Sequence, residues 1–511
     1  MIYDALQLGN FTMHCDVCVV GSGPGGLTAA MVLAEAGLRT VVLEQGDFIA
    51  PDEMTQREEQ MLPRLYCDSA GRTSADRKVR IHQGKGVGGS SLHNLNLVKR
   101  IDATLLRQWH EERVLRHLPP ARWAELYDQI ERWLSVSKVP EDKWNRHNRL
   151  LLQGAQKLGW RAGGLAHNRT DCVGSGFCEL GCAFDAKNNA AKVMLPRAVD
   201  AGATVFTAAQ AVRVRRDGDR VAGVDAVGLD GQGMPRTTLH IRCPRVVVAA
   251  SATGTAALLL RSELADLSGL TGRTLRIHPA VVAAGDFVEP VQAWAGIPQT
   301  VECTEFLRFD GDTGRPGEPT RIWIVPAFGH PMGVATMMPG FGESHRGVMR
   351  RYAHLAVLTA MLHDSTAGHV EPNGDLGLRI DYRLNAADKQ ELLLGWQRLA
   401  QLLLAAGATR VLLPQPVPLE LRSEAELASV LTADPEMSGL TAVHPMASVP
   451  MSDDPRLGPV DSRGAHHGVK GLWVADGSLF PTSIGGPPQL SIYALGLHVG
   501  QAIAQARQAK T

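Results

Sequence analysis

The chain has 511 residues, 44% of them hydrophobic and 20% charged, so it can bury a large core in two or more lobes. Its 52 Lys and Arg residues balance its 52 Asp and Glu residues, which gives no indication of nucleic acid or an anionic membrane as a partner. No apolar stretch approaches the ~20 residues of a membrane-spanning helix, and no removable leader is visible. We therefore expect a soluble cytoplasmic protein without an integral membrane segment, and the eight cysteines do not suggest a disulfide scaffold.

The first fifty residues follow the order of elements of a dinucleotide-binding unit. An apolar strand is predicted over residues 15–20, an alanine-rich helix over 27–36 and a second strand over 40–43. The glycine-rich turn GSGPGG joins the first strand to the helix. Because strand, turn, helix, second strand and an acidic end occur in the right order, the segment predicts a dinucleotide site rather than a chance turn.

The turn and the acidic end have separate tasks at such a site. Gly21 permits the tight turn, Gly23 lets the backbone approach a pyrophosphate, and Gly26 lets the helix pack against the strand. The free N–H groups at the start of the helix attract phosphate. Glu44 can accept the ribose hydroxyls and disfavours a 2′-phosphate, so the segment predicts FAD or NAD rather than NADP.

A second glycine-rich stretch, GKGVGGSSLHN, occupies residues 84–94. Small residues there would let the backbone lie against a flat or anionic ligand, although a flexible loop is an alternative. With both stretches the chain resembles the glucose–methanol–choline (GMC) oxidoreductases, in the branch of long-chain-alcohol and cholesterol oxidases. The resemblance implies that Gly88, Gly89, Ser90 and Asn94 lie along FAD.

The following segment is helical and then rich in cysteine. Cys172, Cys178 and Cys182 are spaced C-x5-C-x3-C, with Ser175 at a position where a ferredoxin-type run has a further cysteine. The thiolates could hold a three-iron cluster, or they are buried or loosely paired thiols. The segment also resembles a Cys-rich stretch of the long-chain-alcohol-oxidising members. Helices are predicted over residues 105–115, 121–134 and 150–158.

Strand patterns return after the cysteine-rich segment, and they are followed by a region in which methionines and tryptophans lie among prolines and glycines. The resemblance places the strand around Val212 at the adenine end of FAD. Methionines and tryptophans between residues 286 and 439 indicate an adaptable apolar pocket or ordinary core. Strands are predicted over residues 204–206, 211–214, 221–227 and 245–250, with a further strand of a substrate-covering sheet over 376–382 and a helix over 388–406.

The C-terminal segment adds a second part of the cofactor site. Asp476 follows a predicted strand, and ligands bind at the carboxyl ends of strands in open α/β sheets. The resemblance implies that Asp476 and Gly477 contact the flavin side of FAD. It also implies that Pro488 and Gln489 direct the last helix towards the flavin, where a positive helix N-terminus stabilises the negative charge of the reduced ring. The strand is predicted over residues 472–475 and the helix over 490–504.

Oxidation of an alcohol requires a group that takes the hydroxyl proton, and a neutral imidazole suits that task. The resemblance identifies His444 as this base or as a hydrogen-bond donor. The family places Asn or His directly before the proline that matches Pro488, but this chain has Pro487, which offers no side-chain donor or acceptor and no N–H. The usual clamp on the substrate oxygen is therefore incomplete. The residues that could replace the missing one are Asn94, His330, His466 and His467.

Together these patterns predict an α/β fold with a discontinuous Rossmann-type FAD domain and an α+β substrate domain that contains an antiparallel sheet. The FAD domain is expected over residues 1–285, with a helical insertion at 104–160, and over 440–511; the substrate domain is expected over 286–439. The function implied is hydride removal from the C–OH carbon of a small or apolar alcohol, with oxygen or another electron acceptor. The alternatives are a same-fold lyase or isomerase, an electron-transferring subunit with an iron–sulfur cluster, and a non-catalytic flavin-binding protein.

Overall fold

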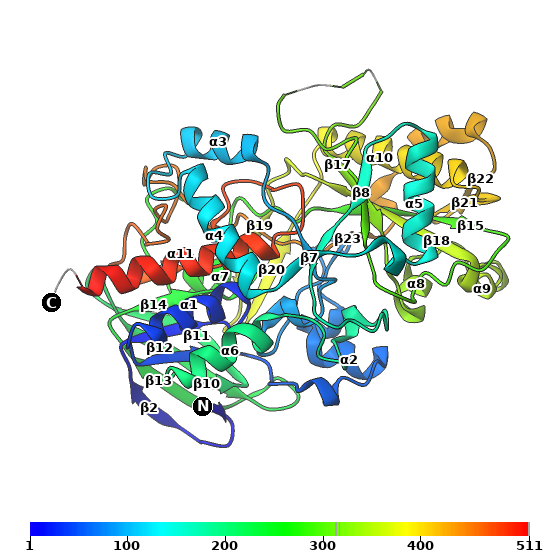
Figure 1. The fold of residues 1–511 in the computed structure, drawn as a ribbon. Helices are drawn as coiled ribbons and strands as arrows, with labels where there is room; N and C mark the ends of the chain where they lie inside the picture. Colours follow the sequence, from blue (N-terminus) through cyan, green and yellow to red (C-terminus); the bar gives the residue numbers. More distant parts are fainter. Residues whose placement is uncertain (312–313, 316, 509–511) are drawn as a thin grey trace.

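A parallel sheet of six strands forms the base of the first lobe (Figure 1). The computed structural model describes residues 1–311, 314–315 and 317–508. The central strands are continuous apolar runs and are fully buried, as strands covered on both faces of a parallel sheet must be. In spatial order the strands are β1 (Ile2–Asp4), β10 (Thr204–Thr207), β4 (Thr40–Leu43), β3 (Val17–Val20), β14 (Val246–Val248) and β24 (Leu472–Val474).

Helix α1 packs against both α6 and α11 beside this sheet. Pro24, inside the predicted glycine-rich turn, is the first residue of α1, which therefore begins three residues before the predicted start, at a position where the missing N–H of proline costs nothing. A Cβ added to Gly496 of α11 would lie 2.3 Å from the carbonyl oxygen of Gly25 in α1, so these two helices meet backbone to backbone. The helices of this lobe are α1 (Pro24–Glu35), α6 (Ala190–Asp200), α7 (Ser251–Arg261) and α11 (Gln489–Gln508).

Three smaller sheets adjoin the parallel one. The strand predicted at 376–382 exists as β20, but it pairs with β19 in a separate hairpin and does not join the large sheet of the second lobe. The reason is local, because the short turn at Gly374 folds the segment back onto its own neighbour. The sheets comprise β11 (Ala209–Asp217), β12 (Arg220–Leu229), β13 (Pro235–Arg242) and β2 (Phe11–His14); β6 (Leu97–Val98), β9 (Ala166–Asn168) and β7 (Val136–Lys138); and β19 (His369–Asn373) with β20 (Gly377–Asp381).

A sheet of nine strands organises the second lobe. Its pairs are antiparallel except for β23 with β5, which confirms the expected antiparallel sheet beside a Rossmann-type one. The strands are β22 (Leu419–Leu421), β21 (Arg410–Leu413), β15 (Ala280–Asp286), β18 (Leu355–Leu362), β17 (Ile322–Pro326), β16 (Val301–Cys303) and β8 (Ala162–Gly164), together with β23 (Leu440–Ala442) and β5 (Val79–Ile81).

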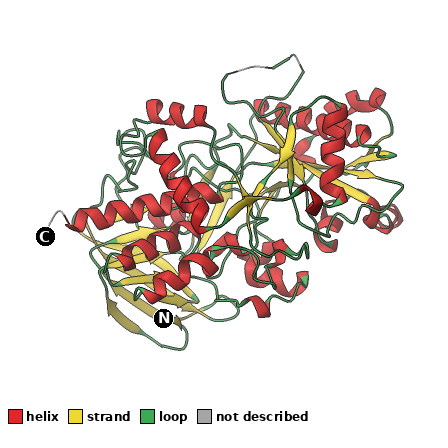
Figure 2. Ribbon diagram, viewed as in Figure 1, coloured by secondary structure: helices red, strands yellow, loops and turns green. Residues whose placement is uncertain are grey.

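The two faces of this sheet have different surroundings, because successive side chains of a strand point to opposite faces. On β15, Val281 and Ala283 belong to the face that joins the main hydrophobic core, which includes Trp396 of α10. Helices flank the sheets of both lobes (Figure 2). The remaining helices, which include those predicted at 105–115, 121–134, 150–158 and 388–406, are α2 (Glu58–Leu65), α3 (Ala103–Glu112), α4 (Pro120–Trp133), α5 (Arg146–Lys157), α8 (Pro331–Met337), α9 (Glu343–Arg350) and α10 (Ala386–Ala405).

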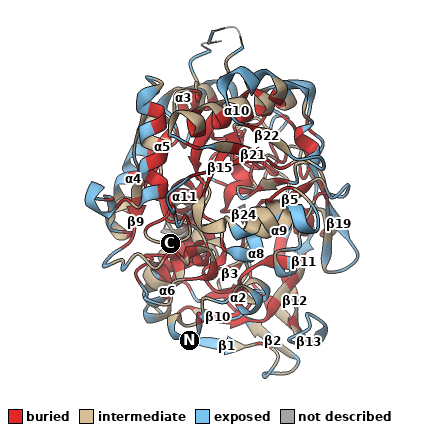
Figure 3. Cartoon of the chain, turned by 90° about the vertical axis from the view of Figure 1, so that its right-hand side faces the viewer, coloured by how far each residue is buried: buried red, intermediate tan, exposed pale blue. Residues whose placement is uncertain are grey.

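The second lobe takes elements from both sides of the boundary predicted at residue 286. That residue is the last of β15, a central strand of the nine-stranded sheet, and β8 and α5 come from still earlier in the chain. Buried residues are concentrated on the strands and on the inner sides of the helices (Figure 3). Within the described residues, none of the helices combines the length and apolar character needed to cross a bilayer.

The contact between α1 and α11 makes a testable prediction. In Gly496→Ala, all three nearest neighbours of the new Cβ are backbone atoms of Gly25, so the helices must separate. We expect a loss of about 1–3 kcal/mol of stability, as is typical of overpacking, measured by denaturant unfolding. Gly347→Ala in α9 is the matched control, because its new Cβ has open space around it. An unfolding midpoint equal to that of the unsubstituted protein would contradict the backbone contact.

Candidate active site

A cavity of about 900 Å³ is lined by residues of both lobes. This volume is at the upper end of the range of about 300–1,000 Å³ that is usual for ligand sites. The ends of the parallel strands and the two glycine-rich stretches form one part of its wall. The nine-stranded sheet and α8 form another.

The two glycine-rich stretches touch each other at the cavity. A Cβ on Gly89 would lie 2.8 Å from Cα of Gly23, and a Cβ on Gly21 would lie 2.3 Å from the carbonyl oxygen of Ala249. Only residues without side chains allow this approach, and Gly21 and Gly89 also have positive φ. The result is a wall of exposed backbone, which suits a pyrophosphate.

Glu44 holds the two stretches together. Its carboxylate accepts hydrogen bonds from the backbone N–H of Ser22 (3.1 Å), Gly46 (2.9 Å) and Gly86 (3.0 Å) and from the hydroxyl of Ser22 (2.6 Å). Burial raises the pKa of Glu44, and these hydrogen bonds oppose the rise. Glu44 lines the cavity. Its predicted contact with a ribose stays a prediction.

Three predicted cofactor residues lie outside the cavity wall. Gly26 supports the first turn, since a Cβ there would lie 2.0 Å from the carbonyl oxygen of Gly21. Gly88 packs against Leu92. Val212 lies at a register shift of β11, and the cavity is lined instead by the residues that precede it, Ala209, Gln210 and Ala211.

The C-terminal segment closes the cavity with a network of buried polar groups. Asp476 accepts hydrogen bonds from the hydroxyl of Thr255 (2.5 Å) and the backbone N–H of Ser478 (2.8 Å). Asn94 donates to the side-chain oxygen of Gln489 (2.7 Å), which is the first residue of α11. The second glycine-rich stretch is therefore fixed to the start of the last helix.

The predicted residues in the cavity wall are Gly21, Gly23, Glu44, Gly89, Ser90, Asn94, His444, Asp476, Gly477, Pro488 and Gln489.

His444 has a partner that the sequence patterns did not identify. Its Nδ1 lies 3.1 Å from Nδ1 of His278, and both rings line the cavity. The backbone N–H of Gly485 lies 3.1 Å from Nε2 of His278 and can only donate, so this Nε2 accepts. A neutral His278 then carries its proton on Nδ1 and donates to His444, whose own proton must be on Nε2.

Burial keeps both rings neutral at ordinary pH. It lowers the pKa of His444 to about 3 and that of His278 well below its usual range. His278 also has φ of +52° and precedes Pro279. The His-Pro pair was visible in the sequence, but only the fold places it against His444.

Of the four residues proposed to replace the missing polar group at Pro487, two line the cavity. Asn94 does so, with its amide engaged by Gln489. His330 does so too, and its buried Nδ1 has no hydrogen-bond partner among the residues that the structure describes. His466 and His467 are held elsewhere, the latter by the carbonyl oxygen of Ser452 at 2.8 Å, and do not belong to the cavity wall.

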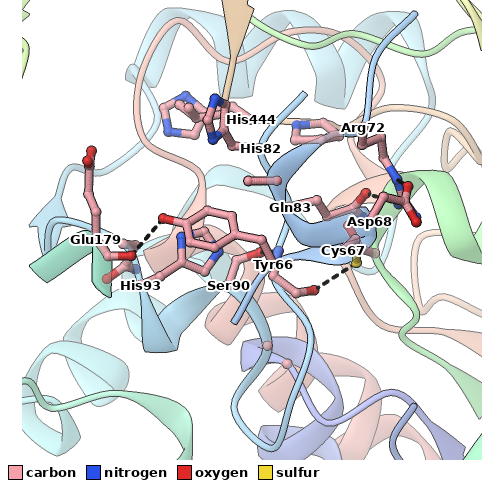
Figure 4. A pocket seen from close by; sticks show the side chains of 18 of the residues that line it. Tyr66, Cys67, Asp68, Arg72, His82, Gln83, Ser90, His93, Glu179 and His444 are labelled. Carbon is pink, nitrogen blue, oxygen red and sulfur yellow. Dashed lines mark hydrogen bonds and ion pairs between the residues drawn. The ribbon is translucent and has the colours of Figure 1, made fainter. Parts of the chain in front are cut away.

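Aromatic rings gather at one side of the cavity (Figure 4). Tyr66 and His93 are in ring contact, with centroids 4.0 Å apart, and His82 meets Tyr66 edge-on. The hydroxyl of Tyr66 donates to the carbonyl oxygen of Glu179 (2.8 Å). Nε2 of His93 is buried without a partner in the described part of the chain, and the ring of His93 lines the cavity.

The nine-stranded sheet gives the cavity an apolar arm. Alternate side chains of β15 and β18 face the cavity and not α10. Thr359 contributes a hydroxyl to an otherwise apolar set on these strands and β17. The set comprises Ala280, Val282, Trp323, Val357 and Met361.

The three closely spaced cysteines do not gather into a metal site. Cys178 is buried, whereas Cys172 and Cys182 are partly exposed, and all are free thiols. Among the residues that the structure describes, no group of three or more His, Cys, Asp and Glu side chains is arranged to hold a metal ion. This geometry gives the iron–sulfur alternative no support.

The chain matches family models described as GMC oxidoreductase over residues 31–280 and 365–496. An uncharacterized GMC-type oxidoreductase of Mycobacterium tuberculosis is 35% identical over 95% of this chain and 75% of its own length. A long-chain-alcohol oxidase of Arabidopsis thaliana is 26% identical over 97% of this chain and 67% of its own length.

A solved structure shares the fold. The crystal structure of pyridoxine 4-oxidase from Mesorbium loti superimposes with a TM-score of 0.71 at 19% identity and covers 96% of this chain and 99% of that chain. At this level of identity the likeness concerns the fold alone.

The contact between His278 and His444 predicts opposite effects of two similar substitutions. Asn and Asp both tolerate positive φ. In His278→Asn the amide can still donate to Nδ1 of His444, so the Nε2–H tautomer should persist. In His278→Asp the carboxylate can only accept, so the proton of His444 should move to Nδ1. Nitrogen NMR of histidine-labelled protein reports the tautomer, and the same tautomer in both variants would contradict the proposed hydrogen-bond direction.

Proposed function

The chain belongs to the GMC oxidoreductase family, and we propose that it is an FAD-dependent oxidoreductase that removes a hydride from the C–OH carbon of an alcohol with an apolar body. The observation that carries the proposal is one cavity in which His444, two backbone walls built from glycine and an apolar sheet face come together.

The residues of the cavity fit FAD. Gly23 exposes backbone to open space that a Cβ would fill, Gly89 lets the second stretch lie against Gly23, and the buried Nε2 of His93 has no partner among the described residues. FAD, when bound, accepts the hydride. The residues that would hold it are Gly21, Gly23, Glu44, Gly89, Ser90, Asn94, Asp476, Gly477, Pro488 and Gln489.

His444 is the residue that we assign to the substrate hydroxyl. In the tautomer favoured by His278 and Gly485, His444 presents Nε2–H and donates a hydrogen bond to the alcohol oxygen. To act as the base it must present a bare Nε2, which requires its proton on Nδ1 facing His278. In that tautomer the N–H of Gly485 and an Nε2–H of His278 face each other as unpaired donors, each at a cost of about 1–3 kcal/mol, which is still small beside a catalytic barrier. The same side chain can thus orient the alcohol and take its proton.

The apolar arm supports an alcohol whose body is hydrocarbon. Val282, Val357 and Met361 face the cavity, and burial of each CH₂ of a substrate against such a surface contributes about 0.8 kcal/mol. The relative from Arabidopsis thaliana carries the name long-chain-alcohol oxidase, which agrees with this class. The electron acceptor that restores the oxidised enzyme is oxygen or another oxidant, and oxygen uptake during turnover distinguishes them.

Anaerobic mixing with a series of alcohols tests the proposed reaction and the role of His444. We expect an apolar alcohol to bleach the flavin spectrum of the purified protein. His444→Ala should slow this bleaching by about 10²–10⁴-fold, as loss of a general base does, with FAD still bound. His369→Ala, on the exposed part of β19, is the control. An oxidised spectrum that no alcohol changes would contradict alcohol oxidation and favour the lyase or isomerase alternative.

A substitution in the apolar arm tests the substrate class separately. Val282→Phe should narrow the arm and reduce kcat/KM for long primary alcohols by about tenfold or more relative to short ones. Val288→Phe is the matched control, because Val288 is 71% exposed. If Val282→Phe leaves the ratio of long to short alcohols unchanged, the alcohol chain does not occupy this arm.

A further inference from the structure

Lys187 is a fully buried lysine that neither the sequence patterns nor the proposed reaction uses. Its side chain is 1% exposed. Its ammonium donates three hydrogen bonds, to the carbonyl oxygens of Leu92 (2.9 Å), Asn94 (2.6 Å) and Cys178 (2.9 Å). All three donor positions of the ammonium are therefore satisfied by backbone.

Two of these bonds hold the second glycine-rich stretch where it meets the cavity. Leu92 and Asn94 flank His93, whose ring lines the cavity. Asn94 in turn holds Gln489 at the start of α11. A single ammonium thus fixes the backbone from which the ring of His93 and the amide of Asn94 project.

The third bond explains the cysteine-rich segment. The carbonyl oxygen of Cys178 belongs to a short 3₁₀ turn, Cys178–Leu180, which brings that segment to the ammonium. The contact with Lys187 is made by the backbone of this segment and not by a thiol. This contact connects the segment to the cofactor side of the cavity.

The charge of Lys187 has no ion-pair partner in the described part of the chain, and burial raises the pKa of the neighbouring Glu179 to about 8, so that this carboxyl does not supply a full counter-charge at neutral pH. Carbonyl oxygens satisfy its hydrogen bonds, but they carry no net charge, and no carboxylate forms an ion pair with it there. A buried charge without a partner is costly, so folds keep one where an opposite charge is bound or develops. The cavity next to the loop is where that charge can appear.

On the basis of the proposed function, we propose that Lys187 is a positioning residue of the FAD site. Its hydrogen bonds fix the loop that carries His93 and Asn94, and its unpaired positive charge stabilises the negative charge that the flavin gains on reduction. Electrostatic groups fixed in advance in a site of low dielectric constant act in this way without reorganisation.

Two substitutions separate the tether from the charge. Lys187→Gln keeps an N–H donor for the carbonyl oxygens but removes the charge, whereas Lys187→Met removes both. Lys192→Met is the matched control, because it removes a lysine from the nearby surface of α6, where Lys192 pairs with Asp185. The measurements are the FAD content of the purified protein, the reduction potential against a dye, and the affinity for sulfite, whose addition gives a flavin anion.

We expect Lys187→Gln to retain FAD and to lower the ratio of reduced to oxidised flavin at a fixed potential by about tenfold, which is about 30 mV for a two-electron couple. Sulfite affinity should fall in parallel. Lys187→Met should in addition lose most of its FAD. A potential and sulfite affinity in Lys187→Gln equal to those of the unsubstituted protein would overturn the role of the charge, and normal FAD content in Lys187→Met would overturn the tether.

The unsubstituted protein provides a second test that needs no folded Lys187 variant. Burial lowers the pKa of Lys187 to about 8, and a negative charge in the cavity raises it again. Reduction should therefore take up one additional proton above about pH 8, so that the reduced-to-oxidised ratio falls an extra tenfold per pH unit there. A constant slope through this range would contradict the proposal. The titratable or charged groups around Lys187 are His93, Arg169, Cys178, Glu179 and Cys182.

Glu179 needs its own control in this titration, because burial raises its pKa to about 8 as well. The change of slope should persist in Glu179→Gln if Lys187 causes it, and its loss in that variant would assign the proton to Glu179. A purified protein without any flavin, by contrast, would contradict the proposed function itself. The two failures are therefore distinguishable.

Discussion

Close approach of backbone to backbone is the constraint on which this site depends. The turn after β3 lies directly against the end of β14, the end of β24 and the second glycine-rich stretch because Gly21, Gly25 and Gly89 have no Cβ to keep these segments apart. The same absence leaves N–H groups and Cα atoms facing the cavity. Any side chain at these positions would push neighbouring segments apart and so move the walls of the cavity. The fold and the site therefore both require glycine at these positions.

Buried polar side chains then join segments that are far apart in the chain. Glu44 links the turn at Ser22 to the loop at Gly86, and Asn94 links that loop to Gln489, 395 positions later. Lys187 adds the cysteine-rich segment to the same loop. Because a buried polar group that loses its partner costs about 1–3 kcal/mol, these bonds favour one relative placement of the segments.

The pair formed by His278 and His444 shows how a backbone group can govern the chemistry of a side chain. The N–H of Gly485 is a fixed donor, so it decides which nitrogen of His278 is protonated and, through the shared hydrogen bond, which nitrogen of His444 is. Gly485 precedes Pro487, the position at which the expected polar side chain is absent. The same loop that lacks a side-chain clamp therefore contributes a backbone donor to the histidine pair.

Local periodicity, turn chemistry and motifs of adjacent residues were enough to predict the Rossmann-type unit, the two glycine-rich loops and the main helices, while His444 was brought forward as a candidate by its resemblance to a family motif. Only the tertiary structure decided that His278 is the partner of His444, that His466 and His467 lie elsewhere, and that β20 forms a local hairpin. It also decided that the second lobe takes β8, α5 and β15 from before residue 286. The contact of His278 with His444 and the pairing of β8 with β16 are set by packing between residues more than a hundred positions apart, and no local pattern in the chain carries that information.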